Sequence, residues 1–168
     1  MDPDTIQKPS SDVVANTARP TCQHTIRESV TISGRGLMLG EEAVVTIEPA
    51  EVGHGIVFER IDLDPPVRIP ALIEYAIERD RRTTLQRDGA SVETVEHCLS
   101  ALSGLGIDNA LLRVTGPELP LGDGSALPWL EPLQAVGLQA QDAERTLLKV
   151  IRPIVIEDNG AMIAAFPC

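Results

Sequence analysis

Short runs of β-branched and aliphatic residues recur along the chain, separated by turns that contain Gly or Pro, and such runs predict strands. The segments concerned are 24–32, 43–51, 55–63, 67–71, 109–120, 145–157 and 161–168. Two segments predict helices instead, 91–106 and 129–138. We therefore expect an α+β fold: a two-layer sandwich of a mostly antiparallel sheet with helices on one face, plus an extra C-terminal β-hairpin.

The segment 91–106, SVETVEHCLSALSGLG, is the clearest predicted helix. Ser91 or Thr94 can cap its N-terminus, and Gly104 and Gly106 can end it. An apolar stripe predicts the face that packs on the sheet, and it contains Val95, Cys98, Leu99 and Leu102. The second helix contains Pro132, which is tolerable only near a helix start.

The chain divides into three predicted parts. Residues 1–21 contain acidic residues, Ser and Pro without an apolar stretch, so we expect a flexible tail. Residues 22–143 form the first α+β domain, within which 73–90 predicts an irregular insertion with a turn at Asp88-Gly89. The polar stretch 138–144 predicts a break, and 144–168 a hairpin that begins an incomplete second domain.

Composition excludes several function classes. A net charge of −11 repels phosphate backbones, and an aromatic content of 2% provides no stacking platform, so we expect no nucleic-acid partner. No apolar run reaches the length of a transmembrane helix. The three cysteines form no CxxC pair, which favours a reducing cytoplasm over a disulfide framework.

The strongest candidate for chemistry is the pair Glu96 and His97 in the first two turns of the predicted helix. A neutral imidazole can bind Zn²⁺, and an adjacent carboxylate can act as a general base. The alternative is a capping carboxylate beside a half-buried imidazole. His24 and Glu28 would lie ~13 Å apart on a strand, too far for one ion. His54 lies in a glycine turn, where a solvated side chain is the simpler interpretation.

Two loops are further candidates. The segment 116–128, GPELPLGDGSALP, could bind phosphate through backbone amides, but a rigid turn with Asp123 or Ser125 capping the second helix is favoured. The arginines of 79–84, RDRRTT, could hold a phosphate or be solvated in a loop, and both interpretations stay open.

Six linked segments resemble the first domain of the UDP-3-O-acyl-N-acetylglucosamine deacetylases. They read QHTIRESVTISGRGL, GIVFERIDLDPPVRIPA, RRTTL, TVEHCLSALSGLGIDNALLRV, GPELPLGDGSALPWL and RPIVIEDNGAMIAAFP. The resemblance covers residues 22–168, and its specificity comes from the order of the motifs. That family removes an N-acetyl group in the committed step of lipid A synthesis, and its fold places two α+β sandwiches across an active-site cleft.

The resemblance implies roles for particular residues. His97 matches a zinc ligand and Glu96 the general base that activates water. Arg82, Thr83 and Thr84 fall where the family has an inserted element that lines the site of the UDP-3-O-acyl-glucosamine-type substrate. The expected cofactor is therefore zinc, and the expected activity is amide hydrolysis.

Two departures from the family pattern limit what this chain does alone. The family's second domain supplies a His-x-x-x-Asp pair of zinc ligands that this sequence lacks, so the zinc site is incomplete. In addition, Met38 replaces a polar residue in the turn GLMLG. We therefore weigh three interpretations: an enzyme component completed by a separately encoded second half, a non-catalytic module that binds a sugar nucleotide or a protein, and a non-functional truncated copy.

Overall fold

The computed structural model describes residues 21–147 and 149–167. The expected tail at 1–21 lies outside the described residues except for Thr21. In chain order the elements are β1 (Cys22–Ile26), β2 (Val30–Arg35), β3 (Glu42–Pro49), β4 (Ile56–Arg60), β5 (Val67–Pro70), the short 3-10 helix η1 (Ile73–Tyr75), β6 (Ala76–Ile77), β7 (Thr84–Arg87), β8 (Ala90–Glu93), α1 (Glu96–Leu105), β9 (Ala110–Val114), α2 (Leu127–Val136), β10 (Leu138–Glu144), β11 (Ile154–Asp158) and β12 (Ala161–Ala165).

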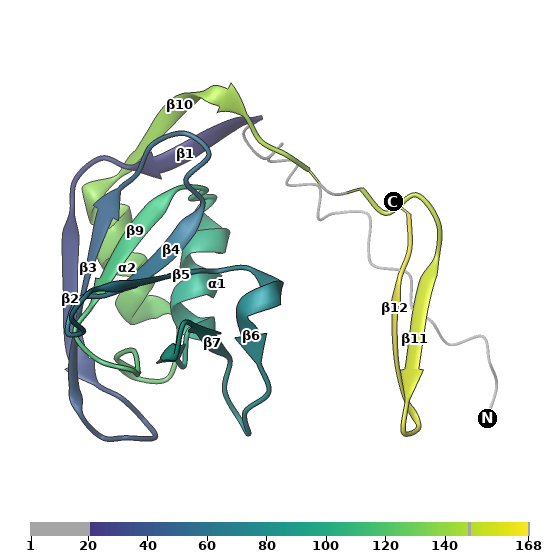
Figure 1. Ribbon diagram of the computed structural model, residues 1–168. Coiled ribbons are helices and arrows are strands. Elements are labelled where there is room, and N and C mark those ends of the chain that lie inside the picture. The colour runs from purple at the N-terminus through teal and green to yellow at the C-terminus, as the bar shows by residue number, and fades with distance from the viewer. Residues whose placement is uncertain (1–20, 148, 168) are drawn as a thin grey trace.

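A five-stranded sheet forms the first layer, in the order β2-β3-β9-β4-β5. Neighbouring strands are antiparallel except for β4 and β9, which run parallel with Phe58 opposite Leu112. Both helices lie on one face of this sheet (Figure 1). The α+β class and the two-layer arrangement predicted from sequence are therefore confirmed.

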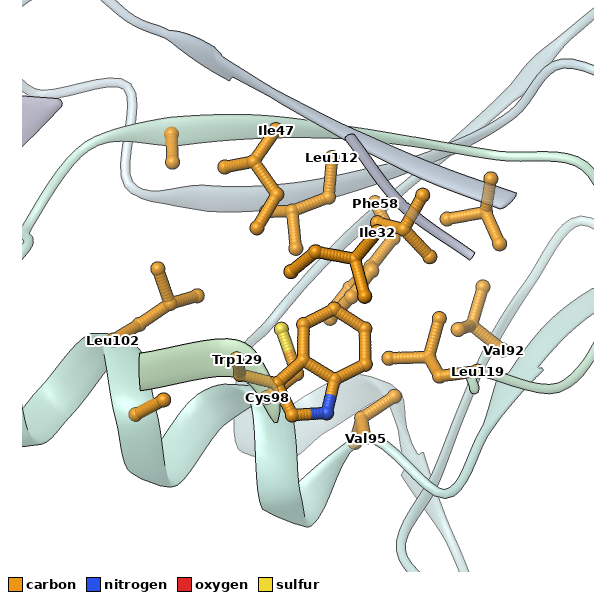
Figure 2. Packing of buried hydrophobic residues seen from close by; sticks show 14 of the residues in the cluster. Ile32, Ile47, Phe58, Val92, Val95, Cys98, Leu102, Leu112, Leu119 and Trp129 are labelled. Carbon is orange, nitrogen blue, oxygen red and sulfur yellow. The ribbon is translucent and has the colours of Figure 1, made fainter. Parts of the chain in front are cut away.

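The core lies between the sheet and the helices, as Figure 2 shows. Alternate residues of β3 point inward, which explains why Val45 and Ile47 are fully buried while Val44 is exposed. Trp129 of α2 packs beside Cys98 of α1 at its centre (Figure 2). Cys98 is fully buried as predicted, and burial raises the pKa of its thiol far above its usual range.

The strand predicted at 24–32 is wrong, because two strands occupy it. β1 pairs with β10, whereas β2 pairs with β3, so the chain must bend between them at 27–29. The predicted break at 138–144 is also wrong, since these residues form β10, with His24 opposite Ala140. A domain boundary at 143/144 stays a prediction, and it falls at the end of this strand.

The segment 73–90 is more regular than predicted. β6, β7 and β8 form a small three-stranded sheet instead of an irregular insertion. The predicted turn at Asp88-Gly89 is confirmed: these two residues have φ angles of 50° and 80°, and the turn joins β7 to β8.

The predicted limits of the first helix need correction at both ends. Its expected first turn forms β8 and pairs with β7, so α1 begins at Glu96, and neither Ser91 nor Thr94 caps it. Gly104 lies inside α1, while Gly106 ends it in the left-handed conformation at φ 76°. The second helix begins at Leu127, which places Pro132 inside it instead of near its start.

The C-terminal hairpin predicted from sequence is confirmed, although its first strand begins at Ile154 instead of at residue 145. β11 and β12 pair antiparallel around Asn159-Gly160, whose φ angles are 47° and 80°. The hairpin stands apart from the sandwich in Figure 1, and every residue from 151 to 167 is exposed. Within the part of the chain that the structure describes, no helix is long and apolar enough to cross a membrane.

Candidate active site

Glu96 and His97 are the first two residues of α1. Glu96 is held in place by the preceding loop, because its Oε2 accepts a hydrogen bond from the backbone N–H of Thr83 at 3.0 Å. The His97 side chain is half-buried, so its imidazole is not sealed inside the apolar core. The structure therefore keeps the predicted base and the predicted ligand side by side at a helix N-terminus.

The residues just before α1 adopt a conformation that the sequence did not predict. Thr94 has a φ of 58°, which is rare for a β-branched residue, and its side chain is buried. Its hydroxyl donates to Glu118 instead of capping the helix. Val95 follows as the N-cap residue, and its N–H donates to the carbonyl of Thr83 at 3.4 Å. The start of α1 is thus fixed by contacts from outside the helix.

The three residues predicted to line a substrate site have different surroundings. Thr83 lies beside Glu96 and is exposed. The Nε of Arg82 lies 2.7 Å from Oε2 of Glu93, and both side chains are mostly buried. Thr84 is fully buried, and its hydroxyl has no hydrogen-bond partner among the described residues. The structure thus brings only Thr83 next to the candidate base, and the lining role of Arg82, Thr83 and Thr84 stays a prediction.

The loop before α2 forms a hydrogen-bonded turn, but the N-cap residue of α2 is Ala126, so neither Asp123 nor Ser125 occupies the predicted capping position. Asp123 Oδ1 accepts hydrogen bonds from the backbone N–H and the hydroxyl of Ser125, at 2.9 and 2.7 Å. The Ser125 hydroxyl in turn accepts from the N–H of Leu127, the first residue of α2. The hydrogen bonds from Ser125 hold the pKa of Asp123 below its usual range, and the charge of His97 lowers that pKa further.

Glu118 is a buried carboxylate that the sequence analysis missed. Its two oxygens accept hydrogen bonds from the N–H groups of Met38 and Leu39, both at 2.8 Å, and from the Thr94 hydroxyl at 3.0 Å. A Cβ at Gly36 would collide with this carboxylate, so only glycine leaves room for it. Burial alone would raise the pKa of Glu118, but these donors together hold that pKa below its usual range.

Acid is expected to weaken the fold through Glu118. Because its pKa is lower in the folded state than in the unfolded chain, its stabilisation is complete above the unfolded pKa, about 4.3, and disappears as the pH falls through the folded pKa. The free energy of unfolding, measured by urea denaturation at pH values from about 7 to 3, should fall at the acid end. The Glu118→Gln chain should lose less stability over the same range. Equal acid slopes in the two chains would contradict this assignment.

The other histidines make local contacts away from this site. The Nδ1 atoms of His24 and His54 each lie 3.0 Å from a backbone carbonyl oxygen close in sequence. Within residues 21–147 and 149–167, no three His, Cys, Asp or Glu side chains come together to hold a metal ion. Catalytic zinc usually takes three protein ligands. His97 fits one position of such a site, and the described residues do not complete it.

Comparison with known proteins points to one family. The family model of LpxC, the UDP-3-O-acyl N-acetylglycosamine deacetylase, matches residues 23–168. The UDP-3-O-acyl-N-acetylglucosamine deacetylase of Legionella pneumophila (strain Corby) is 43% identical over 145 residues, covering 86% of this chain and 48% of the relative. The protein of the same name from Myxococcus xanthus (strain DK1622) is 42% identical over 145 residues, covering 86% and 46%. The chain thus spans about half the length of the curated relatives it matches.

Proposed function

Because the chain belongs to the UDP-3-O-acyl N-acetylglycosamine deacetylase family, we propose that it supplies the Glu96–His97 half of a zinc-dependent deacetylase. The proposed reaction removes the N-acetyl group from UDP-3-O-acyl-N-acetylglucosamine in lipid A biosynthesis, the reaction that the names of the relatives describe in part. The observation that carries the proposal is the placement of this pair at the start of α1, with Glu96 fixed by Thr83 and His97 partly open to solvent. We place the protein in the cytoplasm, since Cys22 and Cys98 are free thiols.

The geometry suits two different roles for the two residues. Successive residues of an α-helix point about 100° apart, so Glu96 and His97 would not chelate one ion side by side. Thr83 engages Oε2 of Glu96, and Oε1 is the oxygen that can take a proton from an attacking water. His97 offers one neutral nitrogen as a ligand. Zinc, when bound, would polarise the amide carbonyl and activate the water.

A second half of the enzyme, outside the described residues, would complete the zinc site. The family pattern assigns the remaining ligands to a second domain, and within residues 21–147 and 149–167 His97 is the residue that matches a ligand of the family. The β11–β12 hairpin offers a place for that half to dock, because Ile154, Ile156 and Ile163 are exposed on one of its faces. Exposed apolar surface of this kind is characteristic of a surface that another segment covers.

A non-catalytic binding module is the second candidate function. The observation in its favour is the turn at 36–40, where Leu37, Met38 and Leu39 are all exposed. An apolar turn beside Glu118 would suit a protein or lipid-linked sugar nucleotide better than hydrolytic chemistry. In that case, substitution of Glu96 or His97 would leave binding unchanged.

Mixing the chain with a second half is expected to produce both zinc binding and activity. The partner we would use is the part of the Legionella pneumophila relative that this chain does not match. Alone, this chain should hold zinc weakly; the mixture should hold about one zinc per complex and release acetate from the UDP-sugar substrate. Zinc is measured by plasma mass spectrometry and deacetylation by chromatography. His97→Ala should abolish zinc retention, whereas His54→Ala, a matched histidine control, should not.

Two outcomes would contradict the proposal. One is a mixture that forms a stable complex but neither retains zinc nor deacetylates the substrate, which would favour the non-catalytic module. The other is a chain that fails to remain soluble and folded even in the presence of the second half, which would favour a non-functional copy.

A further inference from the structure

We propose that Glu118 is a positioning residue of the site, fastening the turn at 36–40 to the residues that begin α1 and so setting the direction of Glu96 and His97. The inference rests on the proposed function for its kinetic consequences. Its structural basis is independent of it, because it comes from the hydrogen bonds and the packing of Glu118.

The first observation is how completely the carboxylate is enclosed. Glu118 is 3% exposed, and both of its oxygens accept hydrogen bonds from Met38 N–H, at 2.8 and 3.1 Å. Leu39 N–H adds a third hydrogen bond at 2.8 Å. The carboxylate occupies the space that a side chain at Gly36 would need. A buried charge with this many donors holds its partners in one arrangement, since each donor left unpaired would cost free energy.

The second observation is that the backbone around Glu118 is itself anchored. Glu93 donates its N–H to the carbonyl of Pro117 at 2.7 Å and accepts from the N–H of Leu119 at 3.1 Å. Glu93 is the last residue of β8, so Glu118 is fixed to the strand that leads into α1. The backbone that carries the Glu118 carboxylate is therefore held in place by β8.

The third observation is the strained residue at the other end of the link. Thr94 has a positive φ of 58°, and its hydroxyl donates a hydrogen bond to the Glu118 carboxylate at 3.0 Å. Strain of this kind persists only where the surroundings hold it, and it is frequent at functional sites. Thr94 lies two positions before Glu96, so the hydrogen bond determines the angle at which the chain enters α1. A change at Glu118 should therefore be transmitted to both site residues.

Kinetics of the complemented enzyme test the link directly. Glu118→Gln and Thr94→Val should each lower kcat by about 10- to 100-fold, because a small displacement of a catalytic group has effects of this size. KM should change little. Thr94→Ser keeps the hydroxyl and should restore most of the kcat, which a purely steric role for Thr94 would not explain. If Glu118→Gln does not fold, Thr94→Val still tests the link.

A matched control separates positioning from general loss of stability. Asn109 is another buried polar residue, with hydrogen bonds to Gly55, Gln23 and Gln141. It follows the C-terminal end of α1, about 15 Å along the helix from Glu96. Asn109→Ala should lower the melting temperature at least as much as Glu118→Gln and leave kcat unchanged.

A readout on the chain alone does not depend on activity. In Glu118→Gln and Thr94→Val, the ring ¹H–¹⁵N resonances of His97 should shift, and the amides of Met38 and Leu39 should exchange faster with solvent. The ring of His54 serves as the internal reference. Unchanged His97 resonances in both variants, or an equal loss of kcat in Asn109→Ala, would overturn the inference. An inactive wild-type complex would refute the proposed function. The His97 ring resonances of the chain alone would still decide whether Glu118 positions the start of α1.

Discussion

Replacing Glu96 with Gln is expected to lower kcat of the complemented deacetylase by about 10²- to 10⁴-fold, the usual contribution of a general base. The amide keeps the size of the carboxylate, and its oxygen can still accept the N–H of Thr83, so the start of α1 should keep its shape. What the substitution removes is the capacity to take a proton. Zinc content should therefore stay near that of the wild type, and steady-state kinetics would locate the loss in kcat.

The matched control is Glu131→Gln, which changes an exposed carboxylate on α2 in the same way. It should leave kcat within about 2-fold of the wild type, as expected of an exposed charge without a role in the reaction. A Glu96→Gln enzyme that kept more than a tenth of the wild-type activity would rule out Glu96 as the base. Zinc loss in that variant would instead assign Glu96 to the metal site.

Replacing Gly36 with Ala should destabilise the fold strongly for so small a change. Gly36 does not have a positive φ, so its backbone tolerates alanine; the cost comes from the collision of the new methyl group with the Glu118 carboxylate. Displacing that carboxylate would unpair a buried charge and its donors, which should lower the free energy of unfolding by about 2–4 kcal/mol. Urea denaturation of the chain would measure the change.

Two further chains test this explanation. Gly116→Ala is the matched glycine control, because a Cβ there meets nothing within 4 Å and its φ is not positive. It should change stability by no more than about 0.5 kcal/mol. In a Glu118→Ala background, Gly36→Ala should cost far less than it does alone, since the obstacle is gone. Additive effects of the two substitutions would show that the carboxylate is not what requires glycine at position 36.

Local sequence pattern predicted the architecture well and the boundaries less well. The alternation in β3 and the apolar stripe of α1 are local signals, and both were confirmed. The start of α1 could not be predicted, because the hydrogen bond from Thr94 to Glu118 that fixes the residues before the helix is a long-range contact. β10 was missed for a related reason: LQAQDAE has no alternating apolar face, and its strand conformation depends on β1.

The site was predicted only where the family pattern marks it. The resemblance to the family marked Glu96 and His97, and the structure places them at the first two positions of α1. Glu118 was not predicted as a site residue, because a carboxylate in a Gly-Pro turn is ordinarily exposed to solvent. One signal could have drawn attention to it: Glu118 lies between Pro117 and Leu119-Pro120, in a stretch where a charge is otherwise out of place. The partner that requires it, Gly36, is distant in sequence, so only the fold brings the two together.

The pairing of β1 with β10 has a consequence for synthesis of the protein. Cys22 lies opposite Glu144, so β1, the first strand of the sandwich, can pair only after its last strand, β10, has been made. A ribosome releases β1 early, and its hydrogen-bonding groups stay without their strand partner until Leu138–Glu144 has left the exit tunnel. The nascent chain therefore carries β1 without its strand partner until β10 has been made, and closure of the sandwich is a late event in its folding.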